Sequence, residues 1–338
     1  MGRRAPVSQS VEEGHLKCPQ CGFESHRGHP LGGTTGATGG THSGERVRHA
    51  PATVLDAATS SATTNHPAFD YRRNEHGRDE ARELMRTHRR VAAIYDVHAN
   101  LPALEAVLRE IEQASVDLIL VGGDIVWGPF PRETLDLLAA LGNTANFIRG
   151  NADREVGGRL DTTAGFDEMT ADINVWAADQ LTSQQREWLM ALPITSPQRI
   201  QGLGDVLFCH GSPRSDEEVI TPMTPPDRLR EALSIVPQRT VVCGHTHMQF
   251  QTHLEGKHVV NAGSVGLPYQ GLTGAYWGLF GPEVELRRTE YDTEAAAASM
   301  KRTACPHVEE AFVDYILRPP SAKEVAAHFE SIALTKRY

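Results

Sequence analysis

The sequence predicts an α/β fold built around a largely parallel sheet. Short apolar runs at residues 91–95, 118–121 and 147–148 are typical of buried strands. Stretches with the period of an amphipathic helix separate these runs, and this alternation is characteristic of parallel sheets with helices packed on their faces. An apolar content of 40% is enough for such a core.

The first 84 residues differ from the rest in composition. They are rich in Gly, Thr, Ser, Ala and His, and residues 32–40 are of low complexity. Such a segment cannot bury enough apolar surface to offset the entropy of ordering it. We therefore expect residues 1–84 to be a disordered extension. A translation start at Met85 would leave this extension out of the natural protein.

One cluster of possible zinc ligands lies within this extension. Cys18 and Cys21 form a Cys-x-x-Cys pair, and His26 and His29 follow closely. Two thiolates and two imidazoles can hold zinc in a tetrahedral site. The loop between the two pairs is only four residues long, shorter than in zinc-finger patterns. We therefore favour the interpretation without zinc.

The predicted elements follow one another closely from residue 91 onward. Residues 101–111 have apolar side chains at helical spacing after the first strand. The strand at 118–121 comes next, followed by a helix over 131–138 that begins with a proline. Gly142 is a typical stop signal, and the third strand, at 147–148, ends this unit.

The second half of the chain begins with a helical stretch over 160–192, placed to roof a site between two strands. The alternative is that its Trp176 and Trp188 belong to the core. Further elements are expected as a strand at 204–210, a helix at 226–235 and a strand at 239–243. Four later strands should form a second sheet stacked on the first: 248–252, 257–261, 275–280 and 284–288. The expected organisation is a domain over 85–292 and a helical segment over 293–338.

Side chains that bind metals follow five of these strands. Asp96 and His98, like His245 and His247, are two residues apart, so an extended backbone would place both members of a pair on one side. Ligands of open α/β sheets bind at the carboxyl ends of the strands. The full set is Asp96, His98, Asp124, Asn151, His210, His245 and His247.

These seven donors are enough for two metal ions that share one carboxylate. Asp124 is the natural bridge because it follows the central strand of the predicted unit. Mixed nitrogen and oxygen donors suit Mn, Fe, Zn or Ni better than Ca or Mg. Two such cations about 3.5–4 Å apart can hold a hydroxide for in-line attack on a phosphate.

The order and spacing of these blocks resemble the five-block signature of the calcineurin-like metallophosphoesterases. The resemblance covers about residues 89–290 and is strongest to the small prokaryotic phosphodiesterase or phosphatase branch. It implies a four-layer sandwich of two mixed β-sheets flanked by helices. It also implies two divalent metal ions, with Mn favoured and Fe, Ni or Zn as alternatives. Asp96, His98 and His247 would hold the first, Asn151, His210 and His245 the second, and Asp124 would bridge them.

One position departs from the family pattern. Many members have a histidine directly after the Gly-Asn pair, where this sequence has Ala152. General-acid help is typically worth roughly 10²–10⁴-fold, so poor leaving groups should react slowly and phosphodiesters are favoured over monoesters. Asp153 is the nearest substitute, although an exposed acid would be ionised at pH 7 and would instead organise the loop. Arg149 and Arg214 flank ligands and are candidates for phosphate contacts or for bracing loops.

The resemblance therefore implies a phosphoric ester hydrolase, with a nucleotide among the candidate substrates. The main alternative is a catalytically weak or inactive scaffold that binds a partner protein, as the phosphoesterase-like subunit of the retromer coat is thought to do. A nucleic-acid module using the Cys/His cluster is disfavoured because no basic cluster lies beside it.

The charge and the hydropathy of the sequence limit its possible binding partners and its cellular location. The net charge of −10 lies wholly in residues 85–338, because residues 1–84 hold equal numbers of acidic and basic residues. Bulk nucleic-acid binding is therefore not expected. No apolar run approaches the roughly 20 residues of a membrane span, and the expected location is the cytoplasm.

Overall fold

The computed structural model describes residues 13–18, 23–28, 86–336 and 338. Within the expected extension, β1 (Glu13–Cys18) and β2 (Phe23–Gly28) pair as an antiparallel hairpin that the sequence did not predict. Cys18 ends β1 and His26 lies in β2, whereas Cys21, His29 and Met85 lie outside the described residues. The zinc site and the start at Met85 thus stay predictions.

The five-stranded sheet contains the predicted parallel unit. Its order is β13 (Val284–Thr289), β12 (Ala275–Phe280), β4 (Val91–Ile94), β5 (Leu118–Val121) and β6 (Ala145–Phe147). β4, β5 and β6 are parallel, whereas β12 runs antiparallel to both β4 and β13. The strand–helix–strand pattern therefore identified this half of the fold.

The second sheet has six strands, and the set of strands that form it differs from the prediction. Its order is β10 (Phe250–Leu254), β11 (Lys257–Asn261), β9 (Thr240–Cys243), β8 (Gly204–Cys209), β7 (Thr195–Ile200) and β3 (Thr87–His88). The four C-terminal strands do not form a sheet of their own, because β10 and β11 join β9 whereas β12 and β13 join β4. A period of two reports which face of a strand is buried, but not which strand lies beside it.

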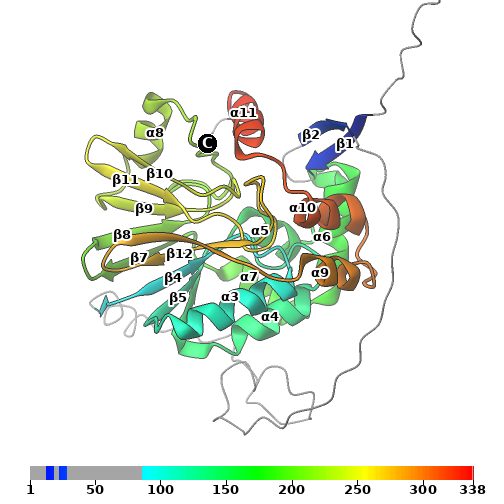
Figure 1. Cartoon of the computed structure of the whole chain (residues 1–338), viewed down its shortest axis with the longest axis horizontal. Helices are drawn as coiled ribbons and strands as arrows, with labels where there is room; N and C mark the ends of the chain where they lie inside the picture. The colour runs from blue at the N-terminus through cyan, green and yellow to red at the C-terminus, as the bar shows by residue number, and fades with distance from the viewer. Residues whose placement is uncertain (1–12, 19–22, 29–85, 337) are drawn as a thin grey trace, which may run out of the picture.

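The two sheets pack face to face around an apolar layer. The largest side chains of this layer are Tyr95, Phe208 and Phe280, all fully buried. The helices α3 (Leu101–Gln113) and α4 (Pro131–Ala139) lie on one outer side, and α8 (Pro226–Leu233) lies on the other (Figure 1). This arrangement of two mixed sheets between helices confirms the predicted fold class.

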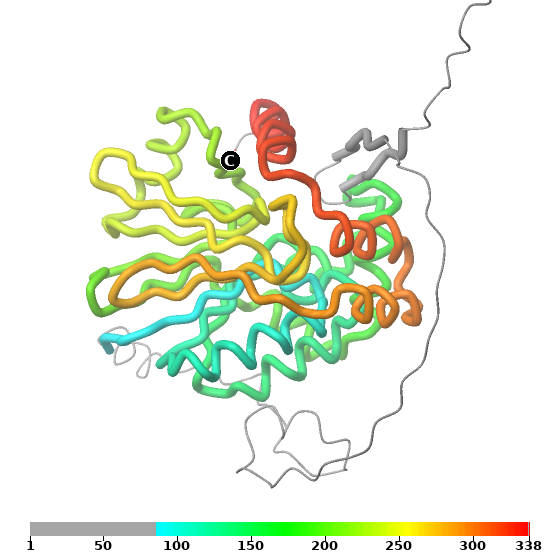
Figure 2. The backbone as a smooth tube through the Cα atoms, in the orientation of Figure 1, coloured from blue at the N-terminus to red at the C-terminus, as the bar shows by residue number. Residues whose placement is uncertain are grey.

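The remaining helices lie near the carboxyl ends of the strands. α5 (Asn151–Gly157), α6 (Glu168–Gln180) and α7 (Ser183–Ala191) connect β6 to β7. The C-terminal segment, red in Figure 2, contains α9 (Thr293–Met300), a π-helix η4 (Glu309–Val313), α10 (Asp314–Leu317) and α11 (Ala322–Ala333). Among the described residues, no helix combines the length and apolar character that crossing a bilayer requires.

Candidate metal centre

The loops after β4, β5, β6, β8 and β9 bring the predicted ligands together. One group contains Asp96, His98, Asp124 and His247, whose donor atoms lie within 4.8 Å of one another. A second group contains Asp124, His210 and His245 within the same limit. Asp124 is the member that both groups share, which is the geometry that a bridging carboxylate needs.

The two oxygens of Asp124 face different groups. Its Oδ2 lies 3.7 Å from His98 Nε2, and its Oδ1 lies 3.4 Å from His210 Nε2. Asp96 Oδ1 lies 3.5 Å from His247 Nε2 and 3.8 Å from His210 Nε2. His98 Nε2 and His247 Nε2 are only 3.1 Å apart, a separation suited to two donors on one cation.

Hydrogen bonds from the far side of two imidazoles orient their free nitrogens. His247 Nδ1 donates to the Leu267 carbonyl at 2.7 Å, and His210 Nδ1 donates to the Gly122 carbonyl at 2.9 Å. In the neutral form of each imidazole, Nε2 therefore carries the lone pair that a metal needs. Because neutral imidazole and carboxylate donors without thiolate suit Mn, Fe, Zn or Ni, this donor set fits the divalent ions that the resemblance implies.

Asn151 lies between Gly150, which packs against Asp124 and His210, and Ala152, whose N–H donates to Asp124 Oδ1. Its Nδ2 donates to Glu155 Oε1 at 3.1 Å. Its Oδ1 is buried and has no hydrogen-bond partner among the described residues, and the same is true of His210 Nε2. Buried polar atoms are rarely left unpaired, so these two atoms indicate ligands for a cation. Glu155 was not predicted from the sequence, although its i+4 spacing from Asn151 on one helix was a usable signal.

Burial and neighbouring charge shift the pKa values of the histidines in opposite directions. Burial lowers the pKa of His98 to about 4 and that of His245 to about 4, so both are neutral donors at pH 7. For His210, burial is outweighed by the carboxylates of Asp124 and Asp96, which raise its pKa to about 10. The metal-free centre therefore holds a proton on His210, which a cation would have to displace.

The ligands lie on strained loops rather than on strands. Asp96, His98, Asp124, His245 and His247 have φ values of 52°, 48°, 53°, 64° and 56°. The left-handed region costs roughly 1–2 kcal/mol per non-glycine residue, and such strain clusters at functional sites. The two-residue spacing thus does not act through an extended backbone, as the sequence analysis assumed, because β4 ends at Ile94 and β9 at Cys243.

Two glycines permit the backbone to approach the ligands. A Cβ atom on Gly150 would lie 2.2 Å from Asp124 Oδ1. A Cβ atom on Gly244 would lie 2.6 Å from Asp96 Oδ2. The glycines of the Gly-Asn and Gly-His pairs are therefore required by close packing against the acids.

Asp153 holds the loop that carries Asp124. Its carboxylate accepts hydrogen bonds from the backbone N–H groups of Asp124, Ile125 and Gly150 at 2.8, 2.7 and 3.0 Å. It is fully buried, and burial raises its pKa to about 7. Ala152 is also buried, and its N–H donates to Asp124 Oδ1 at 2.8 Å. These contacts favour the loop-organising alternative for Asp153.

The two predicted phosphate contacts have protein partners. Arg214 pairs with Glu218 at 2.7 Å and with Glu231 at 2.9 Å, and its Nε also donates to Glu218. Arg149 donates to the Met190 carbonyl at 2.9 Å. The Arg214 guanidinium thus braces the loop after His210, whereas Arg149 Nε is buried without a hydrogen-bond partner among the described residues, so both roles stay open for Arg149.

Comparison with known proteins identifies the family. Residues 90–279, more than half of the chain, match the model of the calcineurin-like phosphoesterase superfamily domain. The chain belongs to this superfamily. The resemblance inferred from the five motif blocks is thereby confirmed.

Relatives of this phosphoesterase cover similar parts of the chain. An uncharacterized protein of Methanocaldococcus jannaschii is 28% identical over 235 residues, which are 64% of this chain and 93% of that protein. A metallophosphoesterase from Sphaerobacter thermophilus is 28% identical, with a TM-score of 0.54 over 67% of this chain and 98% of that one. A hypothetical protein from Pyrococcus horikoshii shares the fold, at 22% identity and a TM-score of 0.58 over 66% and 97% of the two chains.

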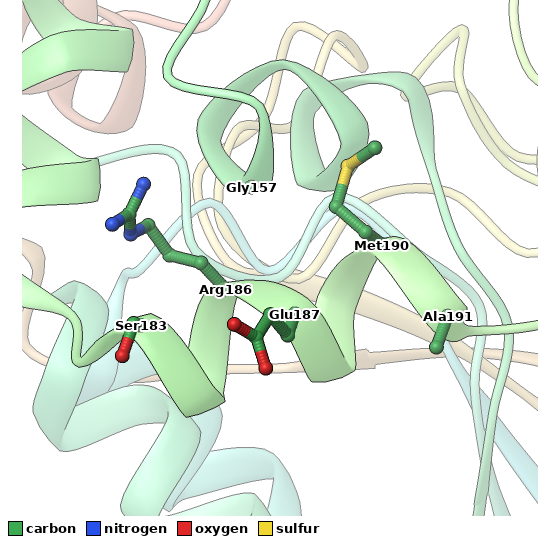
Figure 3. A pocket seen from close by; sticks show the side chains of 6 residues that line it. All are labelled: Gly157, Ser183, Arg186, Glu187, Met190 and Ala191. Atoms are coloured by element: carbon green, nitrogen blue, oxygen red, sulfur yellow. The ribbon is translucent and has the colours of Figure 1, made fainter.

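A separate surface pocket of about 410 Å³ lies between the end of α5 and α7 (Figure 3). None of the predicted ligands lines it; its lining residues are Gly157, Ser183, Arg186, Glu187, Met190 and Ala191. Trp188 of α7 is buried and packs edge-on against Phe147 at 5.1 Å. The segment that was expected to roof the site therefore places this tryptophan in the core, which was the alternative interpretation.

Proposed function

We propose that this member of the superfamily is a metal-dependent phosphoesterase with two divalent cations. Mn²⁺ is the favoured ion at both positions. Asp96, His98 and His247 would hold the first cation, and Asn151, His210 and His245 the second. Asp124 would bridge them. Bound there, such cations supply an activated water and neutralise charge on the phosphoryl oxygens.

The observation that carries this proposal is the position of Asp124. Its two carboxylate oxygens face different histidines, 3.7 Å from His98 and 3.4 Å from His210. A structural carboxylate buried among histidines needs only one such partner. A carboxylate shared between two sets of donors is what a dinuclear centre requires.

The residues around this centre favour phosphodiesters ahead of monoesters. Asp153 fixes the Asp124 loop through three backbone N–H groups and is committed to that task. Ala152 occupies the position where a histidine would protonate the leaving oxygen. Substrates with good leaving groups should therefore react fastest, and alkyl esters should lag by roughly 10²–10⁴-fold.

The direct test uses chelated full-length protein resupplied with Mn²⁺, Ni²⁺, Zn²⁺ or Mg²⁺. We expect metal-dependent hydrolysis of bis-p-nitrophenyl phosphate, with p-nitrophenyl phosphate slower. The variant Asp124→Asn should abolish this turnover, whereas the exposed control Asp205→Asn should keep it.

Two results would contradict the proposal. Near-normal turnover by Asp124→Asn would refute the bridging role. No turnover with any metal, in protein that binds two ions, would favour the scaffold function instead.

A further inference from the structure

The C-terminal helical segment lies against the candidate metal centre. It follows residue 279, where the match to the family model ends. In Figure 2 it runs across the side of the molecule where the loops after the strands gather. The part that matters here is η4 to α11, which supplies Phe312, Tyr315 and Phe329.

Aromatic contacts connect this segment to three of the four ligand histidines. Phe312 packs on Trp127 at 5.0 Å, and Trp127 packs edge-on against His98 at 5.7 Å. On the other side, Tyr315 packs on Tyr269 at 5.6 Å, and Tyr269 stacks on His247 at 4.6 Å. Each of these two histidines is thus separated from the C-terminal segment by a single aromatic side chain.

The third contact is direct and marks the open side of the centre. Phe329 of α11 lies 6.2 Å from His245, ring to ring. His98, His210 and His247 are buried with at most 1% exposure, whereas His245 is only partly buried. A ligand from solvent would therefore approach beside His245, and α11 borders that approach.

Polar contacts fasten α11 to the loop that follows His210. Glu330 accepts hydrogen bonds from the hydroxyls of Thr221 and Thr224 at 2.6 and 2.7 Å, and it pairs with Arg228 at 2.6 Å. Beyond the helix, Lys336 pairs with Glu217 of the same loop at 3.1 Å. These contacts hold α11 against the loop that follows His210.

Two buried donors lie within the aromatic contacts between the C-terminal segment and the centre. Trp127 Nε1 and the Tyr315 hydroxyl are buried and have no hydrogen-bond partner among the described residues. An unpaired buried donor costs about 1–3 kcal/mol. A phosphate ester or a sugar hydroxyl offers the acceptors that both groups lack.

We infer that the C-terminal segment from η4 to α11 is a cap that restricts this centre to small phosphoesters and excludes phosphates within polymers. The inference rests on the proposed phosphoesterase function. A terminal phosphoryl group can enter beside His245, whereas a polymer must pass its chain on both sides of the scissile phosphate. In this proposal the cap blocks that passage, and Phe329, which lies beside His245, is the residue at which it closes.

The first experiment compares substrates of different size. Full-length Mn²⁺-loaded protein should hydrolyse the dinucleotide thymidylyl-thymidine at least 100-fold more efficiently, in kcat/KM per linkage, than a ten-residue oligothymidylate, which has the same leaving group. Phe329→Ala and Glu330→Gln should each raise the oligonucleotide-to-dinucleotide ratio at least tenfold. Leu334→Ala removes an exposed apolar side chain just after the same helix and should keep the wild-type ratio.

The second experiment does not depend on activity. The rate at which EDTA removes Mn²⁺ should rise about tenfold in Phe329→Ala and in Glu330→Gln, but not in Leu334→Ala. Glu330→Gln leaves the apolar core unchanged, so it provides the test if Phe329→Ala fails to fold.

The outcomes separate this inference from the proposed function. Comparable wild-type cleavage of both substrates would overturn the cap while leaving the phosphoesterase in place. If no ester is hydrolysed, the proposed function fails, and unchanged EDTA release rates in both variants would overturn the cap as well.

Discussion

Replacing Gly150 with alanine should disable the metal centre through a single methyl group. Gly150 has φ −93° and ψ 174°, which alanine adopts without strain. The added Cβ would lie 2.2 Å from Asp124 Oδ1 and 2.5 Å from the Asp124 nitrogen. The perturbation is therefore steric and is aimed at the shared carboxylate.

The size of the effect follows from these distances. Cβ contacts below 3.0 Å are essentially never seen, so Asp124 Oδ1 must move by at least about 0.8 Å. Metal–ligand distances tolerate about 0.2 Å. We expect Mn²⁺ affinity to fall about 100-fold, because even the loss of an outer contact to a ligand typically costs 10–100-fold. Overpacking should also lower the free energy of unfolding by about 1–3 kcal/mol.

The assay is calorimetric titration of the chelated protein with Mn²⁺, combined with urea unfolding of the same samples. Gly142→Ala is the matched control, because Gly142 has φ +55° but no atom within 4 Å of an added Cβ. It should lose about 1 kcal/mol from backbone strain and keep both metals.

One result would refute the reasoning. If Gly150→Ala binds two Mn²⁺ ions with wild-type affinity, Asp124 is not the shared ligand, or its position is not set by the Gly150 backbone. Wild-type stability of Gly150→Ala would likewise show that no steric conflict arises, because its backbone angles add no strain.

Three further predictions test ionisable groups, two of them near the centre and one on the surface. Arg214→Ala should lower the free energy of unfolding by about 3 kcal/mol, since it leaves the buried Glu218 carboxylate without a charge partner, bonded only to the Ser212 hydroxyl. A tenfold rise in KM without this loss would instead make Arg214 a phosphate ligand. Because the pKa of His210 is raised to about 10 in the metal-free centre, Mn²⁺ affinity should increase up to tenfold per pH unit between pH 6 and 9, with proton release measurable by calorimetry in two buffers. Burial lowers the pKa of His307, but its acidic partners, Asp172 among them, outweigh burial and raise the pKa above its ordinary value. The contact with Asp172 therefore stabilises the fold below pH 6.5, and this stabilisation is lost as the pH rises. His307→Gln should lower the free energy of unfolding in urea by about 0.5 kcal/mol at pH 6 and leave it unchanged at pH 9.

The sequence predicted the parts of the fold that local patterns encode. The strand–helix alternation from residue 91 to 148 predicted β4, β5 and β6 and the helices between them. The partners of β10 and β12 were not predictable, because both hairpins read alike and only tertiary packing sends them to different sheets. β7 (Thr195–Ile200) was missed because its burial does not alternate regularly along the strand.

The candidate site was likewise predictable only where local sequence patterns encode it. Each ligand-type residue lies within four residues of the end of its strand, so the motif blocks alone placed Asp124 between two groups of donors. The cap was not predictable, because Phe312 and Phe329 lie far along the chain from Trp127 and His245 and carry no motif. Aromatic residues in a helix are ordinary core residues until their partners are known.

The ligands come from both layers of the sandwich. Asp96, His98 and Asp124 follow strands of the five-stranded sheet, whereas His210, His245 and His247 follow strands of the six-stranded sheet. Cations held by both sets would act as a staple between the sheets, in the way that a disulfide joins two segments. At a free metal concentration 100 times its Kd, one such ion adds about 2.7 kcal/mol to the free energy of unfolding. The melting temperature would then rank candidate metals by how tightly they are held, before any substrate is known.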